Sequence, residues 1–197
     1  MRSSSYRFLL SLAISLHAYR AVCDAQPCFE ELPNNAGSAA GPIDRRFDKT
    51  NEGDSFSCDL KIRASAAAEA IDRFRFGVLY DSERHIRAAV RFPLRATIQA
   101  DLEVTEAPRR LRIRSFEDWL SFKRRYLSRF HLAMIACASL HTVKIVKSRS
   151  YGFMIGPGLF WFQSPVGDAS VRVTAINLVP MDEASVLRAC ASESPER

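Results

Sequence analysis

Apolar residues recur along the chain with two different spacings, and each spacing predicts one kind of element. After Ser65, whose hydroxyl can cap a helix, a run of alanines leads to Ile71, Phe74 and Val78 at helical spacing. This predicts a helix with one buried face, which ends before Asp81. Similar spacing predicts three more helices, at residues 83–90, 116–126 and 128–138.

Six other segments have the two-residue alternation or the short apolar runs of β-strands. They are residues 93–98, 110–113, 143–146, 151–155, 159–163 and 171–178. The Gly-Pro-Gly sequence at 156–158 predicts a tight hairpin between two of them. A three-residue link places Ile155 opposite Leu159 and Phe153 opposite Trp161.

The first 25 residues have the composition of a secretory signal peptide. Arg2 and Arg7 precede an apolar run at 8–16, and small residues lead to Ala25. The run is shorter than the roughly 20 apolar residues that a membrane-spanning helix needs. We therefore predict cleavage near Ala25, a periplasmic or secreted location, and a chain that does not span the membrane.

Cysteine usage supports export. Cleavage near Ala25 removes one of the five cysteines and leaves Cys28, Cys58, Cys137 and Cys190. An even number suits an oxidising compartment, and four cysteines allow three pairings. We favour Cys28 with Cys58 and Cys137 with Cys190, because these bonds would pin an N-terminal arm and a C-terminal tail. Free buried thiols are the alternative.

The rest of the chain is long enough for one domain with a core and short for two. Proline, glycine and asparagine interrupt every periodic run at 26–59, which predicts a polar N-terminal arm. The domain is expected at 60–180 and a C-terminal tail at 181–197. Residues 48–59 loosely resemble a calcium-binding loop, but they lack the helix that precedes such a loop and the aliphatic residue at its eighth position. We therefore predict that they bind no metal. We also predict no cofactor.

Three local sequences resemble one family of exported bacterial proteins. They are RFPL at 91–94, SFEDWLSFKRRY at 115–126 and YGFMIGPGLFWF at 151–162. With the order of helices and strands, they resemble the nuclear-transport-factor-2-like, or cystatin-like, proteins over roughly residues 64–178. The resemblance implies an α+β fold in which N-terminal helices pack on a curved antiparallel sheet, forming a cone with a pocket. It implies no particular reaction.

This implied pocket makes several side chains candidates for ligand binding or catalysis. The candidate pocket residues are aromatic: Tyr126, Tyr151, Phe153 and Trp161. Core packing is the alternative for them. For acid–base chemistry the candidates are Asp81, His85 and Tyr126, since Asp81 and His85 have the spacing of one helical turn. Charge complementarity at a helix end explains Asp81 and His85 more simply.

The strongest charge signal is the segment 109–129, where eight basic residues accompany two carboxylates. The full chain carries +6, or +4 without the three arginines and one aspartate of residues 1–25. The predicted anion-binding surface consists of Arg110, Arg112, Arg114, Lys123 and Arg124. Its first three arginines form a stripe, because side chains two apart on a strand share a face. An exported protein would offer this surface to anionic lipid headgroups, an envelope polymer or an acidic protein rather than chromosomal DNA. A solvated surface is the alternative.

Together these features favour a binding module over an enzyme. We expect an exported single domain that binds a small apolar ligand or a cell-envelope partner without turnover. An enzyme using the same pocket for proton transfer or hydrolysis is the second possibility. An inhibitor or immunity-type protein that docks through the basic stripe is the third. A catalytic pocket would hold a buried ionisable group, whereas a binding module would keep such groups at its rim.

Overall fold

The computed structural model describes residue 28 and residues 41–50, 52–99, 107–147, 152–164 and 170–191. The helices in these residues are α3 (Pro42–Phe47), α4 (Phe56–Leu60), α5 (Ala64–Leu79), α6 (Glu83–Ala89), α7 (Phe116–Tyr126), α8 (Arg129–Ala136) and α9 (Glu183–Cys190). The strands are β1 (Val90–Ile98), β2 (Arg109–Ile113), β3 (Val143–Val146), β4 (Gly152–Ile155), β5 (Phe160–Gln163) and β6 (Arg172–Leu178). The predicted signal peptide and Tyr151 lie outside the described residues.

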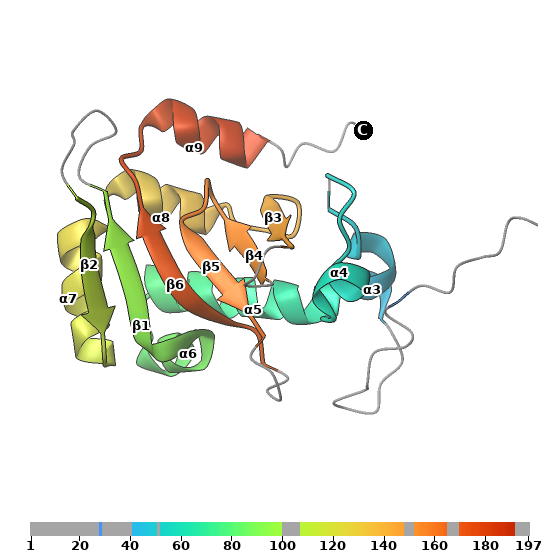
Figure 1. The fold of residues 1–197 in the computed structure, drawn as a ribbon, viewed down its shortest axis with the longest axis horizontal. Helices are drawn as coiled ribbons and strands as arrows, with labels where there is room; N and C mark the ends of the chain where they lie inside the picture. The colour runs from blue at the N-terminus through green and yellow to red at the C-terminus, as the bar shows by residue number, and fades with distance from the viewer. Residues whose placement is uncertain are drawn as a thin grey trace, which may run out of the picture.

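The six strands form one sheet in the order β2-β1-β6-β5-β4-β3 (Figure 1). Four strand pairs are antiparallel, whereas β1 and β6 run parallel. The predicted α+β class is confirmed, but the prediction of a purely antiparallel sheet is wrong at this pair. Successive antiparallel pairings fix the directions of β3 to β6. Strand β6 lies beside β1, and the chain between them includes β2, α7, α8 and β3 to β5. Parallel neighbours require such a crossover.

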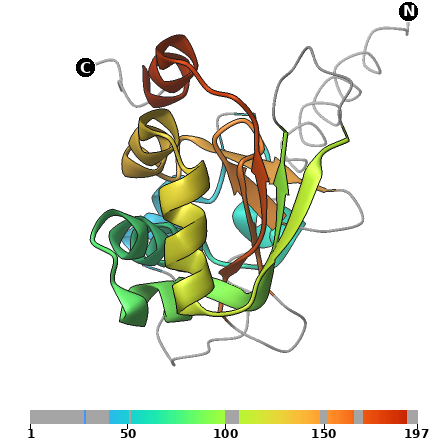
Figure 2. The same ribbon diagram turned by 90° about the vertical axis from the view of Figure 1, so that its left-hand side faces the viewer.

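Helices α5, α7 and α8 lie on one side of the sheet, as Figure 2 shows. Phe74 of α5 is at the centre of this packing, with its ring centroid 5.1 Å from Phe160 and 5.7 Å from Phe162. Trp119 of α7 approaches the same ring at 5.9 Å. All four side chains are fully buried. Tilted and edge-to-face aromatic contacts of this kind stabilise a core beyond the area they bury.

The β4–β5 hairpin has a different register from the predicted one. Phe153 pairs with Phe162 instead of Trp161, because the turn takes in Leu159 and spans residues 156–159. Leu159 is fully buried within this turn instead of extending the strand. A shift of one residue exchanges the two faces of a strand. Phe153 and Phe162 therefore stack in the core at 4.9 Å, and Trp161 turns to the opposite face.

Two disulfides, Cys28–Cys58 and Cys137–Cys190, connect distant parts of the chain. The pairing favoured from the sequence is confirmed. Cys190 ends α9, so part of the predicted tail is helical. Disulfides persist in oxidising compartments, which fits a periplasmic or secreted protein. Among the helices of the described residues, none is long and apolar enough to cross a membrane.

The described part of the predicted polar arm contains two short helices, and a buried carboxylate joins the first of them to the domain. Asp44 accepts hydrogen bonds from the backbone N–H groups of Gly41 at 3.1 Å and Ser65 at 2.9 Å. Burial alone raises the pKa of Asp44, but these donors and the charge of Arg63 hold it below its ordinary value. The carboxylate thereby fixes α3 against the start of α5. The polar composition of residues 26–59 did not indicate this contact.

His131 connects α8 to the end of β6 as a neutral ring. Its Nδ1 accepts a hydrogen bond from the backbone N–H of Ser128 at 3.1 Å, and its Nε2 donates to the Val179 carbonyl oxygen at 3.0 Å. The side chain is buried. Burial lowers the pKa of His131, against a smaller opposite effect of the Val179 carbonyl.

Acidification is therefore expected to destabilise the fold through His131. In the unfolded chain the His131 imidazole is protonated near pH 6.5, whereas in the folded chain its lowered pKa opposes protonation. The contribution of the neutral ring to the free energy of unfolding is therefore complete above that pH and is lost as the pH falls. Urea unfolding at about pH 7.5 and about pH 5.5 should show a larger loss of stability for the wild type than for His131→Gln. Equal losses in the two proteins would contradict this role.

Candidate functional site

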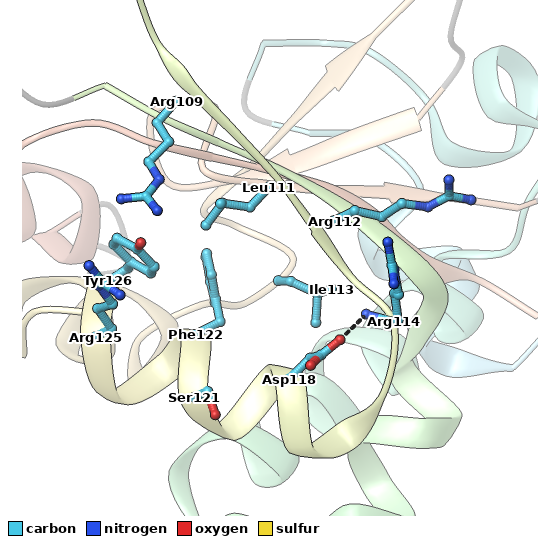
Figure 3. Close-up of a pocket in the computed structure, with 10 residues that line it drawn as sticks. All are labelled: Arg109, Leu111, Arg112, Ile113, Arg114, Asp118, Ser121, Phe122, Arg125 and Tyr126. Carbon is cyan, nitrogen blue, oxygen red and sulfur yellow. Dashed lines mark hydrogen bonds between the residues drawn. The ribbon is translucent and has the colours of Figure 1, made fainter.

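A cleft of about 420 Å³ lies between β2 and α7 (Figure 3). This volume is within the range of small-molecule sites. Its apolar lining is formed by Leu111, Ile113 and Phe122. Its polar lining is formed by Arg109, Arg112, Arg114, Asp118, Ser121, Arg125 and Tyr126.

Strand β2 places its side of the cleft through its pairing with β1. Leu111 and Ile113 lie opposite Ala96 and Leu94, which are buried against the helix layer. Side chains two apart on a strand point to the same face, so Arg109 turns toward α7 with them. The strand thus presents one cation and two apolar groups to the helix.

Helix α7 begins with side chains that fix its junction to β2. The Ser115 hydroxyl accepts a hydrogen bond from the Asp118 N–H at 3.2 Å, and Asp118 Oδ2 accepts one from the Arg114 N–H at 2.9 Å. These two hydrogen bonds start the helix at the end of the strand. The helical period then brings Ser121 and Arg125 to the same side of α7 as Asp118.

Two arginines approach one tyrosine ring at an end of the cleft. The Cζ atoms of Arg109 and Arg125 lie 5.9 Å and 5.4 Å from the ring centroid of Tyr126. Figure 3 shows Arg109 reaching down from β2 and Arg125 beside the ring on α7. Cation–π attraction favours both positions. No ion pair among the described residues involves either arginine, so their N–H groups are available to an anion.

The aromatic residues expected to share one pocket do not lie together. Tyr126 lines the cleft. Phe153 is fully buried in the core, and Trp161 lies on the sheet face turned away from the helices. Tyr151 is outside the described residues.

The three acid–base candidates do not converge either. Asp81 lies in the turn between α5 and α6, so it does not share a helix with His85. Asp81 Oδ1 accepts a hydrogen bond from Lys123 Nζ at 2.7 Å, and His85 Nδ1 lies 2.7 Å from the Ser82 hydroxyl. Neither residue lines the cleft that contains Tyr126.

The predicted stripe on β2 is divided between two faces. Arg110 and Arg112 lie on the outer face by strand alternation. Arg112 also borders the cleft, but Figure 3 shows its guanidinium extending away from Tyr126. Arg114 follows the end of β2 and lines the cleft. The stripe is therefore not one continuous surface.

The two predicted cations of α7 also differ in their surroundings. Lys123 donates to the Val78 carbonyl oxygen at 2.5 Å as well as to Asp81, and its side chain is only 14% exposed. Arg124 is exposed and does not line the cleft. The two arginines that approach Tyr126, Arg109 and Arg125, were not among the predicted anion-binding residues. Sequence spacing could have identified both. Arg109 and Leu111 are two apart on a strand and so share a face, and Arg125 follows Asp118 by two helical turns and so lies on the same side of the helix.

The groups gathered in the cleft are suited to binding. Among its described lining residues, the carboxylate of Asp118 is engaged at the start of α7, and the other charged groups are arginines. Within the part of the chain that the structure describes, no three His, Cys, Asp or Glu side chains are grouped as metal ligands. No family model, no curated protein and no solved structure matches the chain.

Proposed function

We propose that the protein binds an amphipathic anion in the cleft between β2 and α7, without turnover. The observation that carries the proposal is the approach of Arg109 and Arg125 to Tyr126, beside the apolar side chains of Leu111 and Phe122. Guanidinium groups present paired N–H donors that fit a carboxylate, phosphate or sulfate. The adjacent apolar surface suits a short hydrocarbon chain.

The balance of charge favours an anionic ligand over the purely apolar one expected from the sequence. Among the described residues of the lining, Arg109, Arg114 and Arg125 accompany a single carboxylate, Asp118. That carboxylate already accepts a backbone hydrogen bond. Gathered like charges repel one another, and a bound anion relieves this repulsion.

The placement of the acid–base candidates favours binding over catalysis. Asp81 pairs with Lys123, and His85 with Ser82. Proton transfer requires such groups within hydrogen-bond reach of one substrate, and neither lines the cleft with Tyr126. The cleft instead offers donors that hold a negative charge in place.

Calorimetric titration with octanoate tests the proposal. Octanoate combines a carboxylate with a hydrocarbon chain, so it is expected to bind more tightly than acetate, which shares the carboxylate, and octan-1-ol, which shares the chain. The double variant Arg109→Gln/Arg125→Gln should bind octanoate at least about tenfold more weakly, because a hydrogen bond to a charged group contributes about 1.5–3 kcal/mol.

Arg124→Gln is the matched control for this measurement. It removes the same charge from the same helix at an exposed position that does not line the cleft. Its octanoate affinity should equal that of the wild type. An unchanged affinity in the double variant, or an equal loss in Arg124→Gln, would contradict the proposal.

We also propose that the protein is exported and has the nuclear-transport-factor-2-like form. The order of elements supports this form: α5 and α6 precede β1, α7 follows the β1–β2 hairpin, and β3 to β6 are consecutive strands. The two disulfides support export. The signal peptide at residues 1–25 stays a prediction from the sequence.

A further inference from the structure

The face of the sheet turned away from α5 and α7 contains a second depression, of about 590 Å³, beside Trp161. Its described lining residues all come from strands, and the polar ones are Arg91, Arg95, Gln163, Thr174 and Asn177. Figure 2 shows this face on the side opposite the helix layer. No described residue lines both this depression and the cleft between β2 and α7.

An irregularity in strand pairing shapes this depression. Trp161 of β5 pairs with Ala175 of β6, and the next residue, Phe162, pairs with Val173. Thr174 therefore has no partner on β5. This bulge brings Thr174 and Ala175, although adjacent in the chain, to the same depression.

The polar side chains around Trp161 are suited to neutral hydroxyl groups. The Thr174 hydroxyl donates a hydrogen bond to Gln163 Oε1 at 2.7 Å, which orients the amide and leaves its nitrogen as a donor. Asn177 is exposed and adds a second amide. Amides both donate and accept hydrogen bonds, as sugar hydroxyls do.

The same face has unbalanced positive charge. None of the six strands contains an aspartate or a glutamate. Arg95 of β1 lies directly opposite Arg112 of β2, an arrangement in which like charges repel. Among the described residues, no ion pair involves Arg91, Arg95 or Arg112. Bound carboxylates would relieve this repulsion.

We propose that this face binds an acidic polysaccharide, with a sugar ring against Trp161 and its carboxylates on Arg91 and Arg95. The C–H groups of a sugar ring carry partial positive charge and pack on the electron-rich face of an indole. Carboxylates pair with guanidinium groups in a bidentate manner. The arginines continue to Arg112 and Arg110 on the neighbouring strand, which suits a chain with repeated charges better than one small ion.

Tryptophan fluorescence during titration with trigalacturonate, an acidic trisaccharide, tests the proposal. The chain contains two tryptophans, and Trp119 is fully buried, so a change in emission reports on Trp161. Binding is expected to be saturable. Maltotriose, a neutral trisaccharide, should bind at least about tenfold more weakly because it lacks the charge-assisted hydrogen bonds.

Two variants locate the site, and a third is the control. Arg95→Gln removes an exposed charge and should weaken trigalacturonate binding about tenfold. Trp161→Phe, followed by calorimetry because the reporter is lost, should weaken it as well. Arg124→Gln removes an exposed charge that lines neither depression and should leave trigalacturonate binding unchanged.

Three results would overturn the proposal. The first is the absence of trigalacturonate binding, or binding that Arg95→Gln does not weaken. The second is equal binding of maltotriose, which would remove the role of charge. The third is Arg95-dependent binding of phosphatidylglycerol vesicles without binding of the trisaccharide, which would assign the face to a lipid surface.

Discussion

Replacing Gly152 with alanine is expected to destabilise the protein by about 3 kcal/mol or more. A Cβ atom at this position would lie 2.3 Å from the Phe162 carbonyl oxygen and 3.0 Å from Trp161 Nε1. The first contact is with backbone, which cannot rotate away as a side chain can. Strand β4 must therefore move from β5, and the stacking of Phe153 on Phe162 is weakened. Urea unfolding followed by circular dichroism measures the loss.

Gly41→Ala is the control for this effect. A Cβ on Gly41 would have its nearest neighbour, Asp44 Oδ2, at 4.0 Å, so it adds no clash. Its cost should stay within about 1 kcal/mol, because the position caps a helix. If Gly152→Ala were as stable as the wild type, the described spacing of β4 and β5 would be wrong.

The second large effect is expected from removing the Cys137–Cys190 disulfide. The double variant Cys137→Ser/Cys190→Ser should lose about 2–4 kcal/mol of unfolding free energy. The bond joins residues 53 apart in the chain and holds α9 at the end of α8. Without it the unfolded chain gains conformational freedom, and thermal unfolding under non-reducing conditions should begin at a lower temperature.

The other disulfide gives the comparison. Cys28–Cys58 joins residues 30 apart, so its removal should cost slightly less if loop closure dominates. An unchanged unfolding midpoint in Cys137→Ser/Cys190→Ser would show that α9 does not depend on this bond.

Local spacing was sufficient to predict the elements that form through one amphipathic face. The predicted helix that carries Ile71, Phe74 and Val78 is α5, and all three side chains are buried. The parallel pairing of β1 with β6 could not be predicted in this way. It joins strands on either side of α7 and α8, and nothing within either strand sets its direction. The same holds for α3, whose capping carboxylate, Asp44, reaches Ser65 in a distant part of the chain.

The β4–β5 hairpin shows how one residue decides a candidate site. Leu159 is apolar and fits either the end of a turn or the start of a strand. The structure buries it in the turn, which separates Phe153 from Trp161 by placing them on opposite faces. The predicted aromatic pocket depended on the other choice.

Some residues that line the cleft had been named as candidates from the sequence. Tyr126 was identified as a ligand-binding candidate, and the basic character of β2 and α7 was clear. Arg110 and Arg112 were assigned to the predicted anion-binding surface because side chains two apart on a strand share a face. Which face of β2 meets α7 is set by pairing with β1, where Leu111 lies opposite the buried Ala96. That pairing selects Arg109 for the cleft.

Nuclear magnetic resonance of arginine side chains during octanoate titration shows where the anion binds. The Nε–Hε signals of Arg109, Arg124 and Arg125 can be assigned by their absence from the single glutamine variants. Binding in the cleft predicts that the signals of Arg109 and Arg125 shift together and saturate, while that of Arg124 stays in place. If saturating octanoate leaves the signals of Arg109 and Arg125 unshifted, or shifts only those of other arginines, the cleft is not the binding site.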